Sequence, residues 1–160
     1  MSIQIRFAGP TDAALIYGFI LDLAVYEREP DAVKTSPEQL ATQLAAKAPP
    51  FEALIAELDG EAAGFALFFA NYSTWRGCAG IHLEDLFVPP ELRGRGVGLA
   101  LLRRLAQLTV ERGGARLEWA VLDWNTPAIE FYERLGALPM NEWTTFRLTD
   151  DALRRLGASA

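Results

Sequence analysis

The chain has 160 residues, of which 51% are hydrophobic, and it carries a formal net charge of −6 with an isoelectric point near 4.8. This length suits one domain with a sizeable core, and the composition excludes a disordered tail or a low-complexity linker. An acidic chain repels the phosphate backbone, so the charge argues against a nucleic-acid partner and fits cationic substrates better.

The pattern of apolar residues and turn residues predicts an α/β fold in a single domain, residues 1–160, with a mixed sheet and helices on both faces. In chain order the predicted elements are a strand "IQIRFA", a helix capped by Thr11, a helix starting at "SPEQL", strands "FEALIAEL", "EAAGFALFFANY" and "GIHLEDLFV", a helix from Val97 to Arg112, a strand "ARLEWAVL", a helix "AIEFYERL", a last strand "WTTFRL" and a helix capped by Thr149.

Two local signals are especially specific. In "SPEQL", Ser36 is expected as N-cap, Pro37 as the first helical residue and Gln39 as the partner in a capping box. The dipeptide Asp59-Gly60 separates two apolar runs and predicts a β-hairpin.

Cysteine, histidine and the N-terminal region each exclude a class of protein. The single cysteine, Cys78, excludes an internal disulfide framework, and the single histidine, His82, leaves too few ligands for a zinc site. We therefore expect no metal and a cytoplasmic location, with His82 as a structural strand residue. Asp12 and Asp22 bracket the first apolar run, which has no basic cluster before it, so it predicts an amphipathic helix and no membrane partner.

The stretch "RGRGVG", residues 93 to 98, follows a predicted strand and opens a predicted helix. Unpaired backbone N–H groups and the helix dipole meet at such a helix start, and glycines let a phosphate approach closely. The loop is neither a Walker loop, since Gly-Lys-Ser/Thr is absent, nor a dinucleotide fingerprint, since Leu99 and Leu101 occupy the place of its last glycine. It is alternatively a glycine-rich helix start with no ligand.

The same loop fits the signature R/Q-x-x-G-x-G/A of the GNAT superfamily of acetyl-CoA-dependent N-acetyltransferases, which the chain resembles over almost its whole length. The segments "LAVYE", "GIHLEDLFVPPELRGRGVGLALL" and "AVLDWNTPAIEFYERLGA" resemble the polyamine branch, which contains diamine (spermidine/spermine) and thialysine N-acetyltransferases. This resemblance implies a GNAT-like fold with a central, mostly antiparallel sheet, acetyl-CoA as co-substrate and a homodimer.

The resemblance also implies a cofactor site in which the loop holds the pyrophosphate and the strand before it bonds the pantetheine arm. The residues it implies are Leu86, Phe87, Val88, Arg93, Gly94, Arg95, Gly96, Val97, Gly98 and Asn125. Asn125 alternatively caps the helix that follows it.

Two catalytic residues follow from the resemblance. Tyr132 matches the tyrosine that protonates the leaving thiolate, and Glu84 matches a carboxylate that acts as general base, directly or through water. An alkylammonium has a pKa of about 10 and must lose a proton before it attacks a thioester, which a carboxylate can accept. Alternatively, Tyr132 packs in the core and Glu84 is only solvated, since adjacent strand residues such as Glu84 and Asp85 point to opposite faces.

The amine site implied by the resemblance contains Glu27, Trp75, Asp85, Glu142 and Trp143. Glu27 alternatively belongs only to a solvated loop, "EREPD". Its "STW" sequence, ending at Trp75, is similar to the thialysine type, whereas spermidine-type members carry an acidic residue there. This favours a shorter amine or an amino acid with a side-chain amine. The segment "GALPMNEW" is shorter than in relatives, so Glu142 and Trp143 line the amine site or only support the last strand.

We therefore expect an enzyme that transfers an acetyl group to a primary amine of a small molecule by direct attack in a ternary complex. The rival hypothesis is a non-catalytic acyl-CoA sensor, which would need neither Glu84 nor Tyr132. A nucleotide-binding redox domain would need the fingerprint that the loop lacks.

Overall fold

The computed structural model describes residues 1–158, which fall into two compact units. Unit 1 is Met1–Ala120, and unit 2 begins at Val121. In the part of the chain that the structure describes, no helix is long and apolar enough to cross a membrane.

Unit 1 contains a five-stranded sheet with the order β1-β2-β3-β4-β5. Neighbouring strands run antiparallel, except that β4 and β5 run parallel. The strands are β1 (Ile3–Phe7), β2 (Glu52–Leu58), β3 (Glu61–Ser73), β4 (Cys78–Phe87) and β5 (Leu117–Trp119). The predicted α/β class and the mixed, mostly antiparallel sheet are confirmed.

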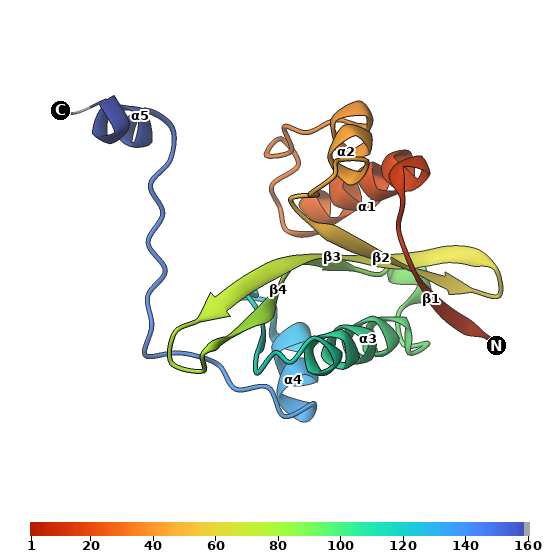
Figure 1. Ribbon diagram of the computed structural model, residues 1–160. Helices are drawn as coiled ribbons and strands as arrows, with labels where there is room; N and C mark the ends of the chain where they lie inside the picture. The colour runs from red at the N-terminus through yellow and green to blue at the C-terminus, as the bar shows by residue number, and fades with distance from the viewer. Residues whose placement is uncertain (159–160) are drawn as a thin grey trace. The chain divides into compact units, whose positions relative to one another are not determined.

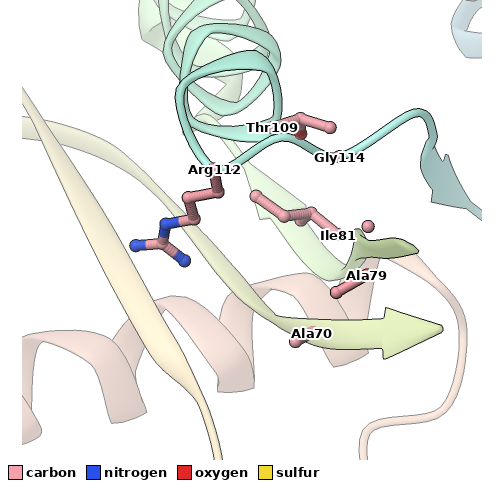
Figure 2. Close-up of a pocket in the computed structure, with 7 residues that line it drawn as sticks. Ala70, Ala79, Ile81, Thr109, Arg112 and Gly114 are labelled. Carbon is pink, nitrogen blue, oxygen red and sulfur yellow. The ribbon is translucent and has the colours of Figure 1, made fainter. Parts of the chain in front are cut away.

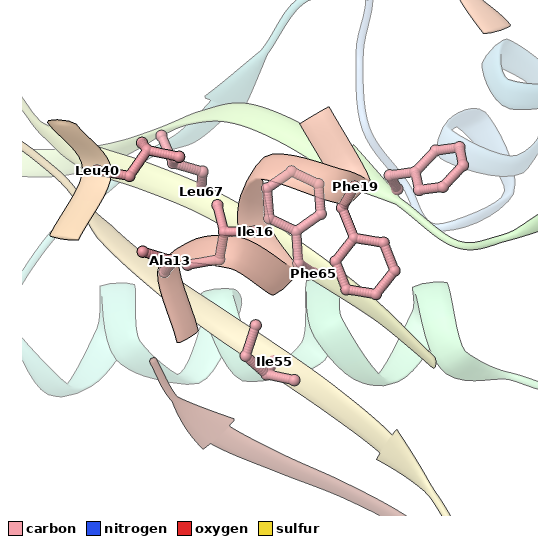
Figure 3. Packing of buried hydrophobic residues seen from close by; sticks show 9 residues of the cluster. Ala13, Ile16, Phe19, Leu40, Ile55, Phe65 and Leu67 are labelled. Carbon is pink, nitrogen blue, oxygen red and sulfur yellow. The ribbon is translucent and has the colours of Figure 1, made fainter. Parts of the chain in front are cut away.

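Helices cover both faces of this sheet. Helices α1 (Ala13–Tyr26) and α2 (Pro37–Leu44) lie on one face, and α3 (Val97–Glu111) lies on the other (Figure 1). On the α1 face, Phe19 stacks on Phe65 with ring centres 5.4 Å apart. Figure 3 shows these rings among the buried side chains of the first core cluster, which are Ala13, Ile16, Phe19, Leu40, Ala53, Ile55, Phe65, Leu67 and Phe87.

The α3 face of the sheet has its own buried side chains because strand residues alternate between the two faces. Leu54 lies between two members of the first cluster on β2 and therefore faces α3, where it is fully buried. Helix α3 buries Val97, Leu101, Leu102, Leu105, Leu108 and Thr109. Its apolar residues recur at helical spacing, as the sequence predicts.

The turn and cap signals are confirmed in part. The Ser36 side chain accepts a hydrogen bond from the backbone N–H of Gln39 at 3.1 Å, as an N-cap does. Asp59 and Gly60 both have positive φ, 52° and 88°, the geometry of a two-residue hairpin turn. The cap predicted at Thr11 is wrong: a short 3-10 helix, Pro10–Asp12, precedes α1, whose N-cap is Asp12.

Two predicted strands differ from the structure. The strand predicted at "ARLEWAVL" is shortened to β5, because only residues opposite Ile81, His82 and Leu83 find ladder partners on β4. The last strand predicted at "WTTFRL" is wrong: residues 143–148 are assigned to no strand and are exposed. β-propensity alone does not make a strand where no neighbouring strand offers hydrogen bonds.

Unit 2 contains two helices, α4 (Thr126–Arg134) and α5 (Asp150–Ala158). Helix α4 has Pro127 in its first turn, as predicted, and the chain turns after it at Gly136, whose φ is +90°. Leu153 donates its backbone N–H to the carbonyl of Thr149, which is where the sequence predicts the start of α5.

Candidate active site

A β-bulge in β4 centres on Glu84. In the register with β3, Asp85 pairs with Leu67 and Leu83 pairs with Phe68, so Glu84 has no partner residue. The extra residue breaks the alternation of side chains along β4. His82 and Asp85 pair with Phe69 and Leu67, which lie on one face of β3, so His82 and Asp85 also share a face. In a regular strand, two residues three positions apart would lie on opposite faces. The expectation that Glu84 and Asp85 point to opposite faces as in a regular strand is therefore wrong.

Three carboxylates interact at this bulge, and we call Glu27, Glu84 and Asp85 the acidic cluster. Burial, and then the negative charges of Glu84 and Glu27, raise the pKa of Asp85 to about 6. Glu27 follows the last residue of α1, and burial together with the charge of Glu84 raises its pKa. Carboxylates that raise each other's pKa are stabilised by a cation between them, so this cluster is suited to an ammonium group.

Within residues 1–158, no three His, Cys, Asp or Glu side chains are arranged to hold a metal ion.

His82 lies beside the acidic cluster. Its Nε2 atom is 3.4 Å from Oε2 of Glu84, and its ring centre is 5.0 Å from the ring centre of Phe69. The Phe69 ring packs against the imidazole, which is still 31% exposed and therefore reaches water. The sequence reading of His82 as a purely structural residue missed this pairing, because a bulge leaves no mark in the hydrophobic pattern.

The glycine loop lies between β4 and α3 and has the backbone of an anion site. Gly94 and Gly96 have φ of 77° and 87°, and Gly96 is the N-cap of α3. Gly96 has no side chain, so this N-cap residue makes no side-chain capping hydrogen bond. The first N–H groups of the helix therefore receive no bond from their N-cap residue, and such groups fit a pyrophosphate.

The two arginines of the loop differ in their surroundings. Arg93 donates its Nε–H to the carbonyl of Val88 at 2.9 Å, and its guanidinium lies 4.6 Å from the ring centre of Tyr26. Arg95 is exposed within the glycine segment. The side chain of Arg93 thus joins the end of β4 to the last residue of α1, a contact that the sequence did not predict.

The remaining predicted cofactor residues of unit 1 have distinct environments. Phe87 is buried in the core, with its ring 6.2 Å from that of Phe19, whereas Leu86 and Val88 are half-buried. Val97 is buried in the first turn of α3, and a Cβ atom built on Gly98 would lie 3.9 Å from the Val88 side chain. Helix α3 therefore packs closely against the residues that leave β4.

The other predicted site residues lie apart from the acidic cluster or belong to unit 2. Trp75 lies in the turn between β3 and β4 and is 88% exposed. In unit 2, Asn125 is at the N-cap position of α4 but its side chain makes no capping hydrogen bond, and Tyr132 lies on α4 beside Phe131, with ring centres 5.7 Å apart. The segment before α5 carries Glu142 and Trp143, both exposed.

A pocket of unit 1 lies on the α3 side of the sheet, at the C-terminal end of that helix (Figure 2). Ala70, Ala79, Gly80, Ile81, Thr109, Arg112 and Gly114 line it. No carboxylate lines it. The guanidinium of Arg112 donates two hydrogen bonds to the carboxylate of Glu52, at 2.7 and 2.9 Å. The pocket has no group that would bind or deprotonate an amine, so the acidic cluster remains the candidate site.

Comparison with known proteins identifies the family of the chain. Residues 18–137 match the model of the acetyltransferase (GNAT) family. The thialysine N-epsilon-acetyltransferase of Bos taurus is 37% identical over 96% of both chains. The L-ornithine N5-acetyltransferase of Arabidopsis thaliana is 45% identical over 59% of this chain and 41% of its own. An integron cassette protein of V. cholerae has the same fold, with 25% identity, a TM-score of 0.83 and 99% of both chains covered.

The resemblance drawn from the glycine loop and the polyamine-branch motifs is thus confirmed, and the enzyme hypothesis is favoured over the acyl-CoA sensor. A family match over 120 residues of sequence, 18 to 137, includes both the acidic cluster and helix α4. The chain belongs to the acetyltransferase (GNAT) family and is an N-acetyltransferase.

Proposed function

We propose that the protein transfers the acetyl group of acetyl-CoA to a side-chain amine of a thialysine-like or lysine-like amino acid, or to a diamine or polyamine. The acidic cluster is the observation that carries this proposal, because its carboxylates attract an alkylammonium before the reaction. The similarity to acetyltransferases named for thialysine and for ornithine supports an amine on a short aliphatic chain.

In this proposal the three carboxylates have different roles. Glu27 and Asp85 bind the ammonium group, and Glu84 removes its proton, directly or through water. The resulting neutral amine attacks the acetyl carbonyl by direct transfer in a ternary complex. Trp75, Glu142 and Trp143 are the further amine-site residues that the family resemblance implies. Glu84 suits the role of base because its side chain is 55% exposed and can pass the proton on to solvent.

The glycine loop holds acetyl-CoA, which supplies the acetyl thioester. The uncapped N–H groups at the start of α3, with Gly94, Gly96 and Gly98, bind the pyrophosphate, and Arg95 adds a positive charge. The backbone of Leu86, Phe87 and Val88 bonds the pantetheine arm, and Asn125 is the further cofactor contact that the family resemblance implies. Arg93 and Val97 are the remaining residues of the pyrophosphate loop, to which they contribute backbone groups.

Tyr132 acts as the acid in this mechanism. Its phenol O–H donates a proton to the thiolate that leaves when the amide forms, and the reaction needs no covalent enzyme intermediate. The family match over residues 18 to 137 supports a single acetyltransferase domain that includes Tyr132 together with the acidic cluster.

The test is turnover of acetyl-CoA, followed as release of free thiol, against a panel of amines. The panel holds thialysine, lysine, ornithine, putrescine, spermidine, spermine and a peptide N-terminus, each with the wild type and with Tyr132→Phe and Glu84→Gln. We expect the highest kcat/KM on thialysine or lysine-like amines and a fall of at least about 100-fold in kcat for each variant.

The control for the amine site is Glu118→Gln, which removes a carboxylate of β5 outside the acidic cluster. A preference for spermidine would retain the enzyme but show that "STW" does not select short amines. No turnover on any amine, with acetyl-CoA still bound, would overturn the proposed substrate class.

We further propose a cytoplasmic homodimer. The single cysteine fits a reducing compartment. Phe146 is 92% exposed in a segment rich in aromatic and β-branched residues, so the sheet edge of a second copy is a suitable neighbour for it. Light scattering coupled to gel filtration tests the dimer: a mass of one chain across micromolar concentrations would contradict it.

A further inference from the structure

His82 and Glu84 form a pair that the proposed function does not use. The bulge at Glu84 leaves its carboxylate outside the pairing of β3 with β4, and Nε2 of His82 lies 3.4 Å from that carboxylate. His82 is the only histidine in the chain. The ring of Phe69, directly across the ladder, packs on the imidazole at 5.0 Å and holds it beside Glu84.

Proton transfer from an ammonium to a carboxylate alone is unfavourable. The ordinary pKa is about 10.4 for a lysine-like ammonium and about 4.3 for a glutamate, so the proton strongly prefers the amine. An imidazole has an ordinary pKa of about 6.5. Transfer of the proton from the ammonium to an imidazole is therefore roughly 100-fold more favourable than transfer to a carboxylate alone. A ring that is 31% exposed can also release the proton to water.

We propose that His82 is the positioning and proton-accepting partner of Glu84. This inference rests on the proposed function, in which Glu84 takes the ammonium proton. The N–H bond of the ammonium breaks and its electron pair stays on the amine nitrogen, while the proton binds to the Glu84 carboxylate. The same proton then passes to Nε2 of the neutral imidazole, which leaves an imidazolium beside a carboxylate, and from there to water.

The charged groups around the pair come from three elements. Strand β4 contributes Asp85, and Glu27 follows the last residue of α1. Strand β5 contributes Glu118, which pairs with His82 in the ladder and lies 3.3 Å from Nε of Arg116. Strand β3 presents only uncharged side chains here, Phe69 and Asn71.

The experiment measures kcat/KM for the preferred amine between about pH 6 and pH 9, at saturating acetyl-CoA. His82→Gln keeps a polar side chain but cannot accept a proton. We expect its kcat to fall at least about tenfold at neutral pH, with KM for the amine changed less than about twofold, and the wild-type acid limb of the pH profile to disappear. Imidazole added to the buffer should restore part of kcat.

Glu118→Gln is the matched control, since it changes the charge next to His82 on the neighbouring strand and leaves the His82–Glu84 pair intact. It should keep kcat close to the wild-type value and retain an acid limb, which the loss of the neighbouring negative charge moves toward lower pH without removing it. A purely structural His82 would give a variant with lower stability but an unchanged profile and no rescue by imidazole, and this result would overturn the inference.

Two further measurements separate this inference from the proposed function. If Glu84→Gln keeps full activity, the base assigned in the proposed function is wrong; if Glu84→Gln is inactive while His82→Gln matches the wild type, only the inference fails. If His82→Gln does not fold, acylation of the single histidine of the wild type by diethyl pyrocarbonate replaces it. Loss of kcat in step with one modified imidazole per chain supports the inference, and full activity after modification overturns it.

Discussion

The guanidinium of Arg93 lies 4.6 Å from the ring centre of Tyr26, while its Nε–H bonds the carbonyl of Val88 at 2.9 Å. One side chain of the glycine loop therefore holds together the last turn of α1 and the end of β4. The residue after Tyr26 is Glu27, a member of the acidic cluster, so this contact also helps to hold the backbone of Glu27 in place.

Replacing Arg93 should destabilise the fold more than replacing its neighbour Arg95. Arg93→Met removes a cation–π contact and a hydrogen bond, which we expect to lower the free energy of unfolding by about 1–2 kcal/mol. Arg95→Met should change it by less than about 0.5 kcal/mol, since that side chain is exposed. Urea denaturation of the two variants checks this, and equal losses would show that the Arg93 contacts contribute nothing.

Truncating Phe65 should be among the most damaging changes in the core. The side chain is fully buried and stacks on Phe19 at 5.4 Å, so Phe65→Ala should lower the free energy of unfolding by about 3–5 kcal/mol. Phe65→Leu, which leaves a smaller cavity, should cost clearly less. A calorimetric comparison tests the order, and equal losses would mean that the site collapses around the cavity.

Stability should depend on pH through Asp85. Burial raises its pKa from the ordinary 3.8 to about 6 in the folded protein, so the protonated form is favoured by folding. This contribution is present below about pH 4 and is lost as pH rises through about 6, by up to roughly 3 kcal/mol. The free energy of unfolding of the wild type minus that of Asp85→Asn should fall over this range.

Asp12 provides the opposite control for that measurement. Its hydrogen bonds with Arg6, at 2.9 and 3.0 Å, hold its pKa below the ordinary value, so its contribution is lost as pH falls. The free energy of unfolding of the wild type minus that of Asp12→Asn should therefore rise, not fall, as pH increases. A flat difference for Asp85→Asn would show that its carboxyl is better solvated than its surroundings indicate.

Gly80 should not tolerate a side chain. A Cβ atom there would lie 2.5 Å from the carbonyl oxygen of Arg116 and 2.9 Å from Oδ1 of Asn71, so Gly80→Ala should cost about 1–3 kcal/mol. Gly18→Ala is the control: nothing lies within 4 Å of that position in α1, and alanine should stabilise the helix by up to about 1 kcal/mol. Thermal unfolding of both variants distinguishes crowding from a general effect of alanine.

Sequence reasoning succeeded where the determining interactions are local. The cap at Ser36 and the hairpin at Asp59-Gly60 depend on residues within four positions of each other, and both have the predicted geometry. Family resemblance supplied the acetyltransferase function and the residues of the candidate site.

Long-range pairing accounts for what the sequence did not predict. Residues 143–148 have the composition of a strand, but a strand also needs a partner that no local pattern specifies. The bulge at Glu84 depends on the register between β3 and β4, and so the nearness of His82 to Glu84 could not be read from their spacing. The contact between Arg93 and Tyr26 joins positions 67 residues apart, as their numbers show.

The bulge also makes the site sensitive to the length of β4. His82 and Asp85 share one side of the sheet because the strand has one residue more than its neighbour requires between them. Deleting any one residue between them would restore a regular ladder and yet turn either the imidazole or the carboxylate into the apolar layer beneath α3. A substitution in this stretch changes one chemical group, whereas a change of one residue in length would place His82 and Asp85 on opposite faces of the sheet, so the number of residues between them matters as much as their identity.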